Sequence, residues 1–374
     1  MKQRIESIDI IRGISIIGIL FMNILGFHFY DVYLEPFKIY KDSMSQTLYQ
    51  LNILFVHNSF YPIFAFLYGL GLAIMYTNMK HKNIKPGIVL YRRIFFMMIF
   101  GFIHGMLLFN GDILHLYATL AIVAIPFLFI RKRHALITST ILFGLNILVW
   151  ILSIIWKEEI NTDGLAQDST AGLKSDIAHH DIAGIIQWNS DIFISEKYPH
   201  VFTWLLPNIL MVFPFILFGI WFYKSDGINK IRHNIKRSTI IAILLAVIGF
   251  AIKAMGVYQY DVITTSQHIY IGGSLVAAAY FIAVVIMCEQ PKLLNLLSPF
   301  KALGKLAFTN YIMQSVFMFI IFYGLGYYSK LTLLQITLIG VGIAITQVIC
   351  SNIYLKYYKM GPLEYVWRKL TYLK

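Results

Sequence analysis

A histidine and an aspartate eight residues apart are the first candidates for chemistry in this chain. His104 lies inside an apolar segment, Asp112 follows just beyond it, and His115 comes three residues later. Eight residues make about two helical turns, so the side chains of His104 and Asp112 project from roughly one face. A carboxylate beside a histidine can fix the tautomer that takes a proton from a hydroxyl, as acyl transfer requires. The spacing therefore predicts that His104 is a base and that Asp112 orients it.

Each of these residues also has a structural explanation. Asp112 can cap the following helix, and His104 can hydrogen-bond to a neighbouring helix. Polar groups in hydrocarbon are costly, however, and a chain that keeps several of them usually uses them. We therefore expect a polar cavity that is also lined by Asn23, in the first apolar segment, and by His115. His57, in the second apolar segment, is another candidate base.

Three arginines at the predicted inner ends of helices form a candidate phosphate site. Asp9 precedes Arg12 by three residues, so the two can pair on one helical face and simply set topology there. With Arg92 and Arg93 at the same depth, Arg12 also predicts a cluster that binds phosphate groups. Acetyl-CoA or another acyl-CoA is the donor that suits such a cluster. Asp9 is expected to line the same cavity.

A polar stripe crosses the predicted ninth span. It consists of Thr309, Asn310, Gln314 and Ser315. These side chains can join helices by hydrogen bonds or line a passage for the donor, and the sequence is compatible with both roles. We expect Asn310 and Gln314 to line the cavity.

The elements that must position these groups are membrane-spanning helices. Of the 374 residues, 58% are hydrophobic and 13% are charged. Apolar segments of about 20 residues, long enough to cross the hydrocarbon, recur along the chain. The sequence predicts an all-α, polytopic membrane protein whose partner is the lipid bilayer. About ten spans are expected, at residues 10–28, 50–76, 92–110, 113–130, 135–156, 201–223, 238–257, 268–288, 306–325 and 331–354.

Basic residues set the expected orientation of these spans. Most of the 31 Lys and Arg residues fall in segments that are cytosolic if the N-terminus and the C-terminus both lie inside. The predicted organisation is an N-terminal half with the candidate site (1–156), an irregular extracytoplasmic loop (157–199) and a C-terminal half (200–374). Within the loop, residues 185–188 are expected at the lipid interface. A short amphipathic helix is expected from Pro362 onward, on the cytosolic surface.

Charge and composition exclude other classes of protein. The net charge of +13 comes from clusters between spans, so nucleic-acid binding is not expected. Cys288 and Cys350 fall near predicted cytosolic ends, so no disulfide is expected. His179 and His180 lack a second pair of ligands, so no metal is expected. A homo-oligomer is left open.

Several motifs resemble those of the YeiB-like bacterial membrane proteins, a poorly characterised family to which a transport role is assigned only in general terms. The motifs are Asp9-x-x-Arg12-Gly13 with Asn23, FAFLYGLG, Arg92-Arg93 with His104 and GDIL, GKLAFTNYIMQS, and GPLEYVWRKLTY. They are spread over essentially the whole chain. The resemblance implies a multi-pass protein of the bacterial cytoplasmic membrane.

The opening pattern of Asp, Arg, Gly and Asn is more distantly similar to that of transmembrane acyltransferases of the heparan-glucosaminide acetyltransferase type. Those proteins pass an acyl group from cytosolic acetyl-CoA to an acceptor on the far side. His57 lies in the comparable second-helix region, at a shorter spacing from the glycine run. The resemblance implies transfer from a CoA-type donor to a small-molecule or glycan acceptor at the outer face. The alternative is a small-molecule transporter or exporter with the same cavity and no covalent chemistry.

Overall fold

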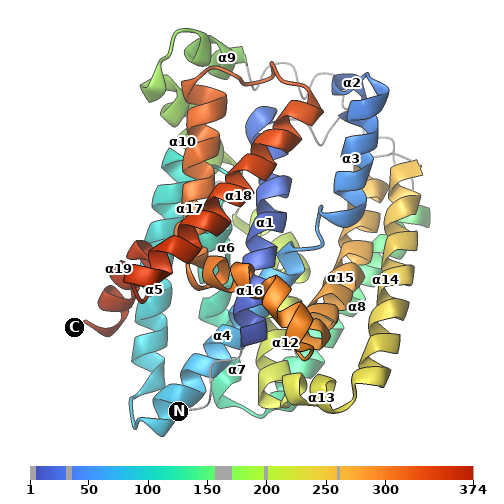
Figure 1. The fold of residues 1–374 in the computed structure, drawn as a ribbon, viewed down its shortest axis with the longest axis vertical. Helices are drawn as coiled ribbons and strands as arrows, with labels where there is room; N and C mark the ends of the chain where they lie inside the picture. Colours follow the sequence, from blue (N-terminus) through green and yellow to red (C-terminus); the bar gives the residue numbers. More distant parts are fainter. Residues whose placement is uncertain (1–5, 31–35, 156–170, 198–200, 259–261, 374) are drawn as a thin grey trace.

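The chain folds into a bundle of helices in the computed structural model, which describes residues 6–30, 36–155, 171–197, 201–258 and 262–373. Within these ranges there are α-helices and one π-helix, and no strand. The elements are α1 (Glu6–His28), α2 (Pro36–Ile39), α3 (Ser43–Phe55), α4 (Tyr61–His81), α5 (Pro86–Leu107), α6 (Ile113–Ala124), α7 (Pro126–Phe129), α8 (Lys132–Ile155), α9 (Ala171–Ala178), α10 (Ile182–Lys197), α11 (Val201–Met211), α12 (Phe213–Lys224), α13 (Gly227–His233), α14 (Ile235–Tyr258), α15 (Val262–Met287), α16 (Pro291–Lys305), α17 (Ala307–Met318), η1 (Phe319–Gly324), α18 (Leu333–Tyr357) and α19 (Pro362–Tyr372) (Figure 1).

Nine helical segments in the described part of the chain are long and apolar enough to cross a membrane. Seven are α1, α4, α5, α8, α14, α15 and α18; the others combine α11 with α12 and α17 with η1. The predicted span 113–130 is divided at Pro126 into α6, which is apolar but only 12 residues long, and α7. The predicted all-α, polytopic membrane fold is therefore confirmed.

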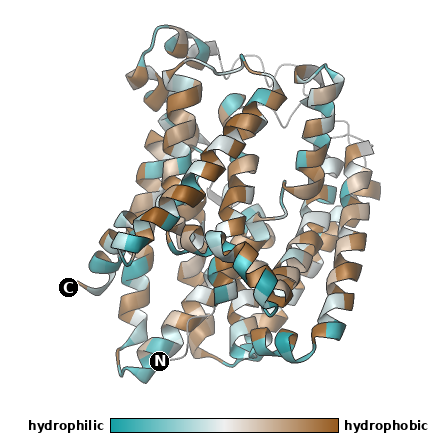
Figure 2. Ribbon diagram, in the orientation of Figure 1, coloured by the Kyte–Doolittle hydropathy of each residue, from teal (hydrophilic) through white to brown (hydrophobic). Residues whose placement is uncertain are grey.

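Helix α1 lies in the middle of the bundle and contacts α4, α15, α16, α17 and α18 (Figure 1). Its isoleucines and leucines are almost all buried. Helices α8 and α14 instead expose rows of apolar side chains, and apolar residues run along the outer helices in Figure 2. Such faces are suited to contact with lipid, because exposure of their apolar side chains to water is unfavourable.

The predicted second span, 50–76, is not continuous. Helix α3 ends at Phe55 and α4 begins at Tyr61, with Pro62 in its first turn. Proline has no N–H group for the helical ladder, so it suits a helix start and not a helix interior. The buried amine of Lys253 on α14 donates to the carbonyl oxygen of His57 and to Ser59 Oγ, both at 2.8 Å. The bond to His57 replaces part of the helical pairing that is lost at the break.

The predicted irregular loop contains two helices, α9 and α10, in the residues the structure describes. Helix α10 packs against α5. The expected interface stretch 185–188 is only partly exposed, because Ile185 is fully buried and the ring of Trp188 lies 5.4 Å from that of Tyr30. Apolar contacts with the bundle, which local sequence does not reveal, stabilise these helices.

Helices α1 and α16 cross with their backbones in contact. A Cβ atom on Gly13 would overlap the carbonyl oxygen of Phe300, and one on Gly304 would overlap the carbonyl oxygen of Asp9. Glycine is required here for close approach, as in other tightly packed membrane helices.

We expect Gly304→Ala to lower the free energy of unfolding by about 1–3 kcal/mol, because the added methyl group overpacks this crossing. Gly342→Ala is the matched control, since a Cβ atom there meets nothing within 4 Å. Thermal unfolding of the detergent-solubilised protein, followed by tryptophan fluorescence, measures both variants. Equal midpoints would contradict the role given to Gly304.

Candidate functional site

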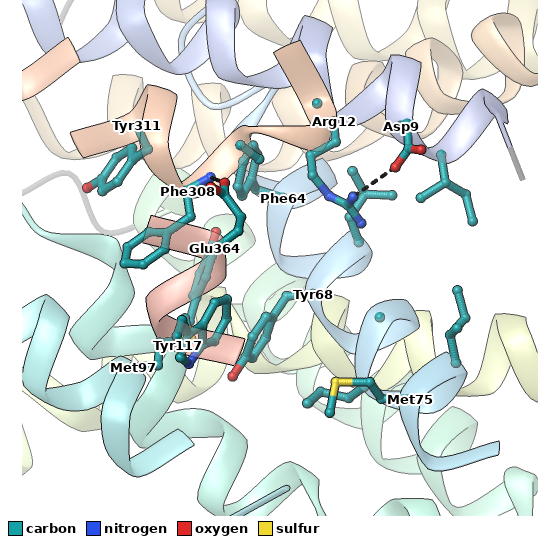
Figure 3. Close-up of a pocket in the computed structure, with 18 of the residues that line it drawn as sticks. Asp9, Arg12, Phe64, Tyr68, Met75, Met97, Tyr117, Phe308, Tyr311 and Glu364 are labelled. Carbon is teal, nitrogen blue, oxygen red and sulfur yellow. Dashed lines mark hydrogen bonds and ion pairs between the residues drawn. The ribbon is translucent and has the colours of Figure 1, made fainter. Parts of the chain in front are cut away.

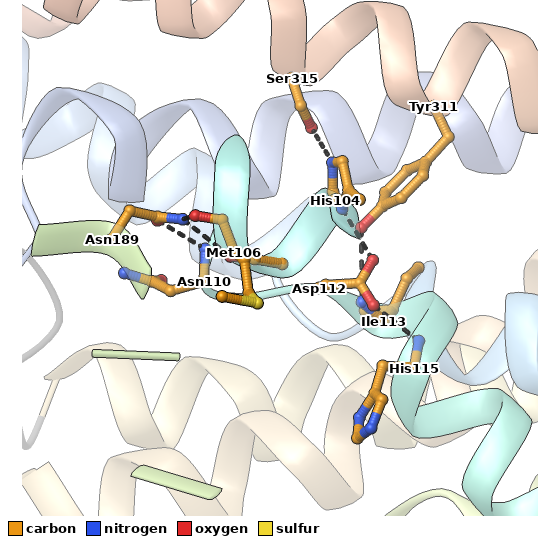
Figure 4. A network of polar contacts seen from close by, with 10 residues as sticks. His104, Met106, Asn110, Asp112, Ile113, His115, Asn189, Tyr311 and Ser315 are labelled. Atoms are coloured by element: carbon orange, nitrogen blue, oxygen red, sulfur yellow. Dashed lines mark hydrogen bonds and ion pairs between the residues drawn. The ribbon is translucent and has the colours of Figure 1, made fainter. Parts of the chain in front are cut away.

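His104 and Asp112 lie against each other, and a serine from a distant helix completes the group. In α5, His104 Nδ1 is 2.8 Å from Asp112 Oδ1 at the start of α6. On the other edge of the imidazole ring, Nε2 is 2.8 Å from Ser315 Oγ on α17. All three side chains are buried. Figure 4 shows them joined in one chain from carboxylate to imidazole to hydroxyl.

Asp112 also caps α6. Its Oδ2 atom accepts a hydrogen bond of 2.6 Å from the backbone N–H of His115. Thus both contacts weighed for Asp112 occur together, one on each carboxylate oxygen. Gly101 permits them, because a Cβ atom on that residue would overlap the His115 backbone. The start of α6 therefore fixes the carboxylate next to the His104 ring.

Helix α10 closes the C-terminal end of α5. The side-chain amide of Asn189 donates to the carbonyl oxygens of Gly105 and Met106, at 2.7 and 2.8 Å. Its Oδ1 atom accepts from the N–H of Asn110 at 2.9 Å. Phe193 lies 5.8 Å from the His115 ring, measured between ring centres. The helix thus caps the end of α5 that follows His104. No sequence motif pointed to Asn189.

A cavity of about 510 Å³ lies among α1, α4, α5, α6, α12, α16, α17 and α19. Much of its wall is aromatic (Figure 3). The predicted ion pair is present, with Arg12 Nη1 3.2 Å from Asp9 Oδ1. The charged residues of the lining are Asp9, Arg12, Arg93, Lys305 and Glu364. The three cations make the cavity suitable for an anionic group.

Helix α19 forms one wall of this cavity and holds both adjacent arginines. The guanidinium group of Arg93 lies 3.4 Å from the ring centre of Trp367, whose Nε1 donates to the Arg93 carbonyl oxygen at 3.0 Å. Arg92 instead donates from Nε to the carbonyl oxygen of Thr371 at 2.5 Å, and it does not line the cavity. The predicted trio is therefore divided: Arg12 and Arg93 face the cavity, and Arg92 anchors α19.

Glu364 of α19 caps the N-terminus of α17. Its Oε1 atom accepts from the N–H groups of Phe308 and Thr309 at 2.8 and 3.1 Å, and its Oε2 atom accepts from the Thr309 hydroxyl at 2.5 Å. An acidic group is favourable there, because a helix N-terminus carries partial positive charge. The cap ties α19 to the cavity wall, a role that the sequence did not indicate.

Tyr311 connects the cavity to the His104 group. It belongs to the cavity lining, and its ring centre is 5.1 Å from that of His104. Its hydroxyl accepts a long hydrogen bond of 3.4 Å from the N–H of Ile113 and lies toward Asp112 (Figure 4). His104 and Asp112 themselves lie behind Tyr311 and are not part of the lining.

Other residues predicted for the cavity lie elsewhere. Asn310 and Gln314 donate to Ser351 and Gln347 of α18, at 3.0 and 2.9 Å, and so join α17 to α18. The remaining three are Asn23, buried on α1, His115, beside α10, and His57, at the break before α4. The structure thus separates one expected chamber into a cationic cavity and several buried polar clusters.

The fold defines a polytopic helical membrane protein with a cationic cavity beside a buried Ser–His–Asp chain. Residues 222–374 match the family described as "Protein of unknown function (DUF418)". The chain is 29% identical to the uncharacterized protein YxaH of Bacillus subtilis (strain 168), over 100% of this chain and 95% of that protein. It is 21% identical to the uncharacterized protein YeiB of Escherichia coli (strain K12), over 99% of this chain and 96% of that protein. The resemblance to the YeiB-like proteins is therefore confirmed. No solved structure matches the chain.

We expect Glu364→Gln to loosen α19, because a neutral amide accepts hydrogen bonds more weakly than a carboxylate. The free energy that holds α19 against α17 falls by about 1–2 kcal/mol. Glu6→Gln is the control, since Glu6 pairs with Lys301 at the surface, where an ion pair contributes little. Limited proteolysis at α19 measures the difference. Equal cleavage rates in the two variants would contradict the capping role.

Proposed function

We propose that this protein is a membrane-embedded acyltransferase of the bacterial cytoplasmic membrane. It moves an acyl group from a cytosolic CoA-type donor to a small-molecule or glycan acceptor at the outer face. The observation that carries the proposal is the position of Tyr311, which borders both the cationic cavity and the His104–Asp112 pair. Donor and base are thereby adjacent.

The cavity supports the donor half of this proposal. Its volume of about 510 Å³ falls within the usual range of small-molecule sites. Arg12 and Arg93 supply planar, permanently charged groups that suit phosphate oxygens. Aromatic side chains, Phe64 and Tyr68 among them, offer stacking surfaces for the rest of the donor. With the N-terminal end of α1 in the cytosol, as the basic residues predict, the donor enters from that side.

The His104–Asp112 pair supports the chemical half. An ionised carboxylate only accepts hydrogen bonds, so the proton between the two residues belongs to His104 Nδ1. Nε2 is then the basic nitrogen, and it is the atom turned away from the carboxylate. A base of this kind accepts the proton of an attacking hydroxyl during acyl transfer.

A transporter is the second candidate, and the break between α3 and α4 favours it. Interrupted helices with buried polar groups at the interruption, here Lys253 and the backbone of His57, are typical of substrate sites in transporters. The two candidates differ in product, because transport changes no bond of the substrate.

We expect saturable binding of acetyl-CoA to the detergent-purified protein, measured by calorimetry. Arg12→Ala weakens this binding about tenfold or more, as the loss of a charge-assisted phosphate contact predicts, and added salt weakens it further. Arg232→Ala is the control, because Arg232 also pairs with a carboxylate, that of Glu289 at 2.7 Å, but lies outside the cavity.

Absence of binding at millimolar acetyl-CoA would contradict the acyltransferase. So would equal losses of affinity in the Arg12 and Arg232 variants. Substrate uptake into proteoliposomes that needs no acyl donor and yields unmodified substrate would instead support the transporter.

A further inference from the structure

Ser315 occupies the position of a nucleophile. Its hydroxyl oxygen lies 2.8 Å from His104 Nε2, and the opposite ring nitrogen lies 2.8 Å from Asp112 Oδ1. Hydroxyl, imidazole and carboxylate in this order are the groups that activate serine for attack on acyl carbon. The three side chains come from different helical segments, and the serine is 211 residues away from the histidine in the sequence.

The surroundings hold these three side chains in one arrangement. Asp112 accepts from the His115 backbone and so is fixed as an acceptor on its second oxygen. His104 is held between Asp112 and Ser315, with Tyr311 against its ring. With Asp112 ionised, Nε2 is the ring nitrogen that can take the serine proton.

Ser315 also lies next to the wall of the cavity. Phe308, Tyr311 and Ser315 follow at spacings of three and four residues and so share one face of α17. The first two line the cavity, and Ser315 lies about one turn, or about 5 Å, further along the helix. A donor with its phosphates at Arg12 and Arg93 would direct its acyl end past Tyr311.

We propose that Ser315 is the acyl-accepting nucleophile and that the protein carries the acyl group as an ester on Ser315 between two half-reactions. This proposal rests on the acyltransferase function proposed above. In place of direct transfer from donor to acceptor, it predicts a covalent intermediate inside the membrane.

The first half-reaction forms the Ser315 Oγ–carbonyl bond and breaks the carbonyl–sulfur bond of the thioester. The serine proton passes to His104 Nε2 and then to the departing thiolate, so CoA leaves as the thiol. In the second half-reaction an acceptor hydroxyl gives its proton to His104 while its oxygen attacks the ester. The ester bond to Ser315 breaks, and the serine oxygen recovers that proton. No oxidant or further reactant is needed.

A covalent carrier solves the problem of access from two sides. The cationic cavity lies on one side of Tyr311, and α10 packs against the C-terminal end of α5, beyond His104. With the acyl group on Ser315, donor and acceptor need not occupy the site together.

The test incubates the whole purified protein with acetyl-CoA or, separately, with a fluorophosphonate, which labels activated serines without regard to the natural acyl donor. Peptide mass spectrometry then locates the adduct. We expect both reagents to modify Ser315, with more than tenfold less modification in His104→Ala. Ser274→Ala is the matched control, because Ser274 is another buried helical serine but donates to the carbonyl oxygen of Tyr270 in its own helix. We expect Ser315 in this variant to be modified as much as in the unsubstituted protein.

Mapping the adduct on the unsubstituted protein decides the proposal even if a variant fails to fold. Protein that binds acetyl-CoA but gains no adduct on Ser315 from either reagent overturns the nucleophile and leaves the acyltransferase standing. Acyl transfer by a Ser315→Ala protein would likewise overturn the nucleophile and leave the acyltransferase standing. Absence of acetyl-CoA binding by the unsubstituted protein would instead contradict the proposed function itself.

Discussion

The carboxylate of Asp112 is the group on which the buried polar structure depends. A carboxylate away from water is stable only when hydrogen-bond donors surround it. Asp112 has the backbone of His115 on one oxygen and the ring of His104 on the other. Through His104 the interaction extends to Ser315, so a single acidic group fixes α5, α6 and α17 at one point. A residue of another type could start α6, but it would not also orient the imidazole ring.

Helix ends inside the bundle follow the same constraint. Each end leaves backbone groups without partners in its own helix, and hydrocarbon offers none. Here side chains from other helices supply them: Lys253 at the end of α3, Asn189 at the end of α5 and Glu364 at the start of α17. Lys224 similarly donates to the carbonyl oxygens of Phe127, Leu128 and Ile130 at the C-terminal end of α7, at 2.8 to 3.0 Å. Lys224, a basic residue at a predicted cytosolic helix end, is thus also a backbone cap.

The sequence was sufficient for the parts of the fold and site that depend on local pattern. Hydropathy predicted most of the spans, and the eight-residue spacing predicted that His104 and Asp112 lie on one side. The contact itself is made by the turn between α5 and α6, and not by one continuous helix. Ser315 could not be singled out, since it is one polar residue among several in its span and its partner is 211 residues away. The adjacent pair Arg92 and Arg93 could not both face one cavity, because neighbouring helical residues point about 100° apart. Helix α10 depends on burial against α5, which no local pattern shows.

Helix α19 is the last helix of the chain to be synthesised. It follows every span in the chain, yet it supplies the cavity wall that positions Arg93 through Trp367. During translation all the spans can therefore enter the bilayer before this wall exists. The growing chain is then an inserted bundle with an incomplete cavity, and the wall is in place only when Glu364 reaches the start of α17. Membrane insertion and completion of the cavity are for this reason separate stages in the formation of the protein.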